Sequence, residues 1–360
     1  MTKNKKILLA PLDWGIGHAS RCVPIIRALQ QKGAHVIVGS SGRSASFLKS
    51  EFPDLQHIDL PGFEISYPHH GSMSLRLLRR SPVILSANHR EHRLLETLIG
   101  EHGIQAVISD NRFGLWSSRA YSVYITHQVS IKAPAGWSFT EGLLYMVHRR
   151  YINNYDECWI PDLEEQGGLS GELAHKRTCP VPTSFIGPLS RFEAPGASAA
   201  EKKYDIMAMV SGPEPQRSLL EKLFLAELKL LGKPAILLQG MPERMEKRTE
   251  ENVEIYSHMN STELRDAILA SGMIICRPGY SSIMDLAVLG KQAIFVPTPG
   301  QTEQEYLADY HRRKHHYYST SQDQFNLKKC LQAGRNYPGI RLDYNNDTLD
   351  AKIDELLSRL

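Results

Sequence analysis

Near its start the chain reads Lys6-Ile7-Leu8-Leu9-Ala10-Pro11-Leu12-Asp13-Trp14-Gly15-Ile16-Gly17-His18-Ala19-Ser20. The apolar run over residues 6–10 is typical of a buried parallel strand, and the glycines after it predict a tight turn. A helix-like stretch, Ala19–Gln31, follows and stops before Gly33. Strand, turn and helix in this order predict the first unit of an α/β fold.

The same alternation continues along the chain and is interrupted once. Strands are predicted at 35–39, 56–59, 106–109, 123–126 and 157–160, and helices at 44–49, 75–100 and 140–153. A segment rich in proline and glycine follows Phe185. The alternation then restarts with strands at 205–210, 235–238, 253–256, 273–276 and 292–296, and helices at 216–231, 262–271, 281–289 and 302–310. Short strands separated by helices predict right-handed βαβ units and therefore two doubly wound parallel sheets.

We therefore expect two α/β domains joined by a linker. The first domain covers residues 1–190, the linker 191–203 and the second domain 204–345, in agreement with a prior of roughly 150 residues per domain for a chain of 360. A terminal helix over 346–360 should pack against another element, with the first domain as the candidate, because it carries a row of apolar residues: Leu349, Ile353, Leu356 and Leu357.

Composition and charge exclude several classes of protein. Hydrophobic residues make up 42% of the chain, and no apolar run approaches the roughly 18 residues of a membrane span. The net charge of +3 is too small to indicate a nucleic-acid partner. The five cysteines are scattered and odd in number, and the start of the chain lacks the apolar core of a signal peptide, so we expect a cytoplasmic protein without a disulfide framework.

The turn Gly15-Ile16-Gly17 lets a ligand approach the backbone, but the ligand is not expected to be a dinucleotide. Ser20 stands where the third glycine of a dinucleotide site would be, and no acidic residue ends the second strand. The turn presents His18 at the helix start, where it either faces a ligand or merely caps the helix. Because His311 and His315 lack an acidic or cysteine partner, we expect no metal site there. No cofactor is expected either.

The second half contains a stronger ligand signature, Arg277-Pro278-Gly279-Tyr280-Ser281-Ser282, between a strand and a helix. Gly279 permits the sharp turn, and the backbone N–H groups of residues 280–282 form an anion seat at the helix start. Asp285 lies about one turn further along the same face, where it could accept from ribose hydroxyls. The alternative is structural: a serine that caps the helix and an acid that suits the helix dipole.

Two further loops follow strand ends in the same half. The first, residues 297–306, is stiffened by Pro297, Pro299 and Gly300 and presents Glu303 and Gln304 at a helix start. The second begins with Ser211-Gly212. Ligands of doubly wound sheets bind at the carboxyl ends of strands, so all three loops can face one cleft between the two halves.

These motifs resemble the donor-nucleotide half of GT-B glycosyltransferases, and most closely family 28, which includes the enzyme that adds N-acetylglucosamine to lipid I. The matching stretches are 277–285 and 299–308 in the second half and Gly15-Ile16-Gly17-His18 in the first. The resemblance implies the GT-B architecture, in which two Rossmann-like doubly wound domains face a central cleft. It departs from the family at Asp285, where glutamate is usual, and at 14–17, where the lipid I enzyme has a glycine-rich triplet.

By position, the resemblance implies a UDP-sugar site. Tyr280–Ser282 would hold the diphosphate, Asp285 the ribose, and Glu303, Gln304 and Glu305 the donor sugar. The segment Tyr256-Ser257 would border the uracil through backbone contacts. The nucleotide-sugar site expected from motifs and resemblance together comprises Gly15, Gly17, Ser211, Gly212, Tyr256, Ser257, Arg277, Gly279, Tyr280, Ser281, Ser282, Asp285, Glu303, Gln304 and Glu305.

The leading hypothesis is an inverting, metal-independent glycosyltransferase that moves a hexose or N-acetylhexosamine from a UDP-sugar to an acceptor hydroxyl. His18 is expected to be the base, because imidazole titrates near neutral pH. Asp110 ends another strand of the same sheet and would orient it; alternatively, Asp110 only caps a loop with Asn111. Two other functions remain open: a UDP-N-acetylglucosamine 2-epimerase-like enzyme and a non-catalytic UDP-sugar-binding protein.

The acceptor is the part of the reaction that the sequence defines least. Two stretches, Met73–Leu85 and Tyr145–Tyr151, interleave apolar and basic residues. They would either lie on an anionic membrane surface, as in family 28 members that glycosylate lipids, or form amphipathic helices packed on their own sheet. The first alternative predicts a lipid-linked or membrane-surface acceptor and a peripheral location on the inner face of the membrane; the second leaves a soluble acceptor equally open.

Overall fold

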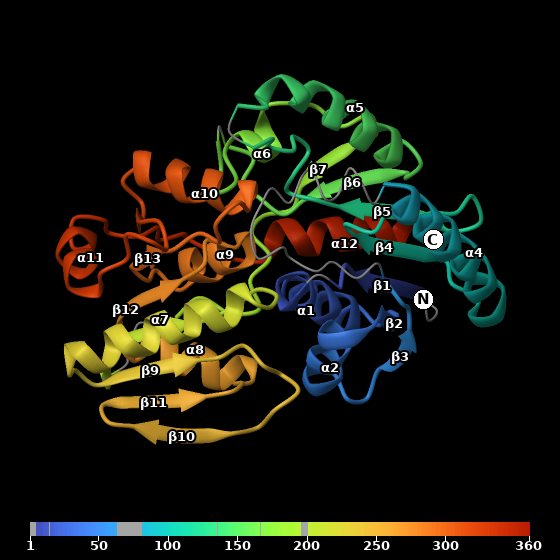
Figure 1. The fold of residues 1–360 in the computed structure, drawn as a ribbon. Helices are drawn as coiled ribbons and strands as arrows, with labels where there is room; N and C mark the ends of the chain where they lie inside the picture. Colours follow the sequence, from blue (N-terminus) through green and yellow to red (C-terminus); the bar gives the residue numbers. More distant parts are fainter. Residues whose placement is uncertain (1–4, 14, 63–80, 135, 166, 196–200) are drawn as a thin grey trace. The chain divides into compact units, whose positions relative to one another are not determined.

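The computed structural model describes residues 5–13, 15–62, 81–134, 136–165, 167–195 and 201–360 (Figure 1). The chain divides into two compact units. The first ends at Arg191 and also contains the C-terminal segment Asn345–Leu360, and the second is Phe192–Tyr344.

The first unit is built on a parallel sheet whose strands follow the order β3-β2-β1-β4-β5-β6-β7. The strands are β1 (Lys6–Pro11), β2 (His35–Ser40), β3 (Gln56–Asp59), β4 (Ala106–Asp110), β5 (Tyr121–Ile125), β6 (Glu157–Ile160) and β7 (Thr183–Phe185). The central strands β1 and β4 are almost wholly buried, which explains why they read as continuous apolar runs.

The helices of this unit are α1 (Ile16–Gln31), α2 (Gly42–Glu51), α4 (Ser81–His102), α5 (Glu141–Ile152), α6 (Glu172–His175) and α12 (Asp347–Arg359), with the 3-10 turn η1 (Ser138–Thr140) before α5. The C-terminal helix α12 lies against α1, with Lys32 Nζ 2.6 Å from Asp354 Oδ2 (Figure 1). Lys352 of α12 also forms an ion pair with Glu157 of β6. These contacts fix α12 to the first unit.

The second unit has a sheet in the order β10-β11-β9-β8-β12-β13-β14, parallel except for β10. Its strands are β8 (Tyr204–Met209), β9 (Ala235–Leu238), β10 (Lys247–Glu250), β11 (Val253–Tyr256), β12 (Ser271–Cys276), β13 (Ala293–Phe295) and β14 (Tyr318–Ser319). Its helices are α7 (Gln216–Leu231), α8 (Ser261–Leu269), α9 (Tyr280–Val288), α10 (Thr302–Arg313) and α11 (Leu327–Gly334). One hydrophobic cluster joins α7 and α11 to the sheet through Leu220, Phe224 and Leu327.

The expectation of two doubly wound α/β sheets is confirmed, with local differences. Strand β10 has no apolar signal because its residues, Lys247-Arg248-Thr249-Glu250, form an edge strand that is mostly exposed. The expected helix at 75–100 is observed from Ser81 to His102; residues 75–80 lie outside the described part of the chain. Among the described residues, no helix combines the length and apolarity that crossing a bilayer requires.

Candidate functional site

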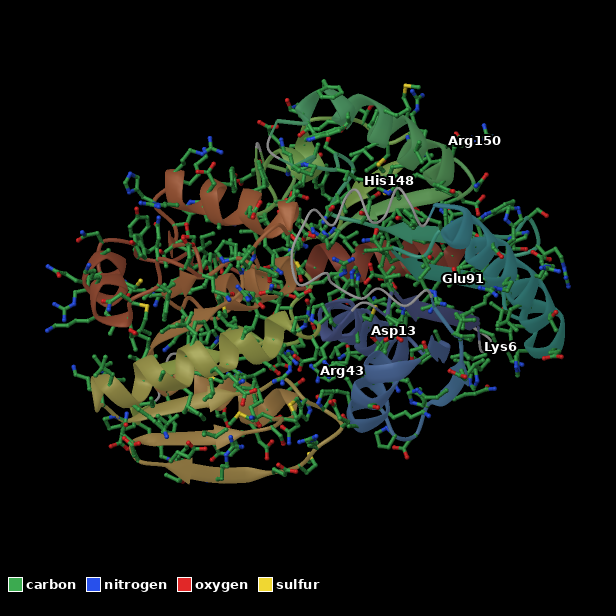
Figure 2. The ribbon with its side chains drawn as sticks, viewed as in Figure 1. Lys6, Asp13, Arg43, Glu91, His148 and Arg150 are labelled. Atoms are coloured by element: carbon green, nitrogen blue, oxygen red, sulfur yellow. The ribbon has the colours of Figure 1, made fainter. Side chains whose placement is uncertain are left out.

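His18 is presented by the connection between β1 and α1. Gly15 adopts φ 141°, a conformation that favours glycine, and α1 begins at the next residue. Asp13 holds the other side of this connection, accepting a hydrogen bond from Ser41 Oγ at 2.8 Å (Figure 2). Gly42 is required beside it, because a Cβ there would lie 2.8 Å from Asp13 Oδ2. The turn is thereby fixed, and His18 falls in the first turn of α1 with 19% of its side chain exposed.

The structure brings His18 and Asp110 together: Asp110 ends β4, and His18 lies in the first turn of the helix that follows β1. Nδ1 of His18 lies 3.1 Å from Oδ2 of Asp110, whose side chain is fully buried. Arg21, one turn after His18 on α1, donates from Nε to the same oxygen at 2.8 Å and from Nη2 to Oδ1. The result is a buried cluster of one carboxylate between an imidazole and a guanidinium.

The charges around Asp110 keep it ionised. Burial alone would raise the pKa of this carboxyl, but the charges of Arg21 and His18 and the hydrogen bonds from both lower it far below its usual range. Asp110 is therefore an anion throughout the physiological pH range and can orient the imidazole through Nδ1. The Nε2 atom of His18 is then the ring atom suited to proton transfer.

The sequence did not single out two members of this cluster, Arg21 and His127. His127 follows the end of β5, is 3% exposed, and its Nδ1 lies 3.0 Å from Nη1 of Arg21. A signal for Arg21 does exist: it is the only charged residue in the otherwise apolar run 19–26, on a helix that packs on the sheet.

In the second unit, Arg277 joins two of the loops that were expected to bind the donor. Its side chain is 1% exposed, and Nη1 donates to the carbonyl oxygens of Val296 and Pro297 at 2.8 and 2.7 Å. Nη2 donates to Gln322 Oε1 at 2.6 Å. All three acceptors are neutral, so they do not balance its charge. Burial lowers the pKa of Arg277 to about 9, which still leaves it cationic at neutral pH.

Helix α9 begins directly after this arginine. Gly279 is its N-cap in extended conformation, and Tyr280, Ser281 and Ser282 form its first turn. Asp285 lies on the second turn and is 7% exposed. The backbone N–H groups of a helix start and the charge of Arg277 thus lie within one short segment, which suits an anionic ligand.

The loop before α10 uses two of its predicted sugar ligands internally. Gln304 Oε1 accepts from the backbone N–H of Thr298 at 2.9 Å, and Glu305 Oε1 accepts from that of Gly300 at 2.8 Å. These bonds fix the loop that presents Glu303, which is partly exposed.

The remaining predicted residues lie on other loops at the same sheet edge. Ser211 and Gly212 follow β8 and are exposed. Ser257 follows β11; its Oγ donates to the carbonyl oxygen of Arg244 at 2.9 Å and is thereby engaged in closing the β10–β11 region. The Tyr256 hydroxyl donates to Glu254 at 2.9 Å. Both side chains serve the unit itself, which leaves backbone atoms for a ligand there.

No group of three or more His, Cys, Asp or Glu side chains among the described residues is arranged to hold a metal ion. The five cysteines, all within described segments, are free thiols.

Comparisons with known proteins agree with this architecture. Residues 214–335 match the family model of the glycosyltransferase family 28 C-terminal domain. No curated protein matches the chain in sequence. Three solved structures are similar over both units: the calicheamicin glycosyltransferase CalG4 (12% identity, TM-score 0.65, 99% of each chain), the spinosyn forosaminyltransferase SpnP (14%, 0.56, 98% of this chain and 95% of that one) and the glycosyltransferase SnogD from Streptomyces nogalater (13%, 0.58, 99% and 95%).

At these identities the structural similarity shows the fold, whereas the family match concerns the second unit. Together they confirm the resemblance inferred from the glycine loops. The chain therefore has the GT-B fold, and its residues 214–335 resemble the C-terminal domain of glycosyltransferase family 28.

Proposed function

We propose that the chain transfers a hexose or N-acetylhexosamine from a UDP-sugar to an acceptor hydroxyl, with inversion at the anomeric carbon and without a metal ion. The observation that carries this proposal is the contact between His18 and the buried, ionised Asp110 at the end of the first sheet. A direct displacement needs a base on the attacking hydroxyl, and an oriented imidazole is suited to that task.

The donor side of the proposal rests on the second unit. UDP leaves with at least two negative charges, and its departure requires positive charge and N–H donors near the diphosphate. The start of α9, with Tyr280–Ser282, supplies N–H groups, and Arg277, whose guanidinium donates to neutral oxygens, lies shortly before it in the chain. Asp285 would accept from the ribose, and Glu303 with Gln304 and Glu305 would border the sugar. The choice of uridine follows from the family resemblance.

The acceptor side of the proposal rests on an apolar surface of the first unit, which we call the 137–147 face. It consists of five exposed residues on η1 and α5 and the segment before them: Trp137, Phe139, Leu143, Met146 and Val147. Phe139 is 78% exposed and Met146 64%. Exposed apolar side chains this close together indicate a binding surface.

We propose that an anionic lipid surface occupies this face, so that the acceptor is lipid-linked. Arg149 and Arg150, both exposed, follow the face on the last turn of α5 (Figure 2). Each such arginine adds on the order of 1 kcal/mol to binding at an anionic membrane. The other stretch expected to take part is Met73–Leu85. Its residues 73–80 lie outside the described part of the chain, and for residues 81–85 the structure describes the backbone but not the side chains.

The reaction is tested with UDP-N-acetylglucosamine, UDP-glucose and UDP-galactose in the absence of an acceptor, monitored by proton NMR. The proposal predicts slow release of UDP with the β-anomer of the sugar appearing first, since these donors are α-linked. Formation of an epimer would instead indicate the 2-epimerase-like function. Binding of all three donors without turnover would indicate a binding protein.

The lipid surface is tested by sedimentation with vesicles. Wild-type protein should sediment with anionic vesicles at low salt and less at high salt or with neutral vesicles. A Phe139→Ser/Met146→Ser variant should remain in the supernatant, while a Leu230→Ser variant, which changes an exposed leucine of the second unit, should behave as wild type. If wild-type protein stays in the supernatant with anionic vesicles at low salt, the acceptor is to be sought among soluble molecules.

A further inference from the structure

Arg21 lies at the centre of the charged cluster, and a base with an orienting carboxylate does not by itself require it. Its side chain is 2% exposed and sits one helical turn after His18. The guanidinium binds both carboxylate oxygens of Asp110, and its Nη2 is also 2.9 Å from Nδ1 of His18. Arg21 therefore touches both members of the proposed catalytic pair.

The contacts set up a charge problem that Arg21 solves. A carboxylate 3.1 Å from an imidazole favours the protonated ring, and a protonated ring cannot take a proton from an acceptor hydroxyl. A guanidinium bound to the carboxylate and adjacent to the ring opposes that attraction. The carboxylate keeps its orienting hydrogen bond, but most of its charge is cancelled.

We propose that Arg21 is a positioning residue that acts through Asp110: it holds the carboxylate toward His18 and offsets the carboxylate's charge, so that the ring can take the proton of the acceptor hydroxyl. This inference rests on the proposed function. In the transfer step, the acceptor O–H bond breaks and its proton goes to Nε2 of His18. The oxygen forms the bond to the anomeric carbon, and the bond from that carbon to UDP breaks, with its electron pair leaving on UDP.

The other titratable groups that face the cluster do not take over this role. Cys22, on α1, has its Sγ 4.0 Å from Asp110 Oδ2, and burial together with Asp110 raises the pKa of this thiol, which keeps it neutral. His127, from the segment after β5, has its Nδ1 3.0 Å from Nη1 of Arg21. Tyr124, on β5, also faces Asp110 and Arg21, and burial raises the pKa of its hydroxyl, which keeps it neutral. The balance of charge is therefore among His18, Arg21 and Asp110.

Holding the Asp110 carboxylate toward His18 requires a guanidinium at position 21, whereas offsetting the charge of the carboxylate requires only a cation there. Lysine has a single ammonium group and cannot bind both carboxylate oxygens in parallel, although it keeps the charge. Methionine removes the charge and keeps much of the volume. The two substitutions therefore separate the two roles.

The test measures UDP release from UDP-N-acetylglucosamine between pH 5 and 9, with NMR titration of the His18 ring in the same variants. In Arg21→Met, the acidic limb of the profile and the His18 titration midpoint should both move upward by about one pH unit. In Arg21→Lys, the limb should stay in place while kcat falls roughly tenfold and the KM for the donor is unchanged. Glu91→Gln, which breaks another buried arginine pair in the same unit, should lower the melting temperature without moving the limb.

The double variant Asp110→Asn/Arg21→Met extends the test if the single variant does not fold. Both charges are then absent, so the His18 midpoint should return to within a few tenths of a pH unit of wild type. The inference is overturned if the midpoint in folded Arg21→Met equals that of wild type, or if the double variant is displaced as far as Arg21→Met. The NMR titration needs no turnover, so a wild type that releases no UDP would contradict the proposed function and still leave the charge balance measurable.

Discussion

Replacing Asp110 by Asn tests the buried charge cluster of the first unit, because it removes the anion and keeps the shape of the side chain. Arg21 would then lose the buried carboxylate that it binds. Breaking a buried ion pair in this way costs about 3–5 kcal/mol, and each kcal/mol lowers the melting temperature by roughly 2–4 °C for a unit of this size. We therefore expect Asp110→Asn to melt roughly 10 °C below wild type.

The assay can report the first unit by itself. All four tryptophans, Trp14, Trp116, Trp137 and Trp159, precede Arg191 in the sequence, and Trp159 is fully buried on β6. Tryptophan fluorescence in urea therefore follows unfolding of this unit. Asp110→Asn/Arg21→Met should regain most of the lost stability, because both charges of the buried pair are then removed together. A double variant no more stable than Asp110→Asn, or an Asp110→Asn protein within about 1 kcal/mol of wild type, would refute the reasoning.

Two further predictions follow from the same structure. His148 (Figure 2) is fully buried, which lowers its pKa to about 4, so below pH 6.5 the unfolded chain binds a proton that the folded chain does not. The free energy of unfolding should therefore fall by about 2 kcal/mol between pH 7 and pH 5, and His148→Phe should remove most of this loss. Urea titrations at the two pH values measure both effects. Asp285→Ala should weaken UDP binding by about 1.5–3 kcal/mol, roughly ten- to a hundredfold, with the fold intact; equal calorimetric affinities for variant and wild type would remove Asp285 from the donor site.

The fold could be predicted because both sheets are almost entirely parallel and their central strands are buried. Strands such as β1 and β4 read as apolar runs, and glycines mark where α1 and α9 start. The His18–Asp110 contact could also be predicted, since Asp110 ends β4 and His18 starts the helix that follows the neighbouring strand β1. Parallel strands share a carboxyl edge, so residues that are distant in sequence meet there.

Other features of the fold and of the site depend on contacts between distant residues, which no local sequence pattern encodes. Strand β10 is charged and pairs antiparallel at a sheet edge, where burial imposes no alternation. Arg21 and Asp110, which are hydrogen-bonded, lie 89 positions apart in the sequence. The guanidinium of Arg277 binds backbone carbonyl groups, which every residue carries. Side-chain identity alone cannot select such partners.

If His18 is the base for sugar transfer from a UDP-sugar, removing its side chain should slow turnover and leave nucleotide binding intact. UDP release and UDP affinity are compared between wild type and His18→Ala, with UDP-N-acetylglucosamine as the donor. The account predicts that turnover falls by roughly 10²–10⁴ while UDP affinity, which depends on the second unit, stays the same. Near-normal turnover by folded His18→Ala protein would contradict it.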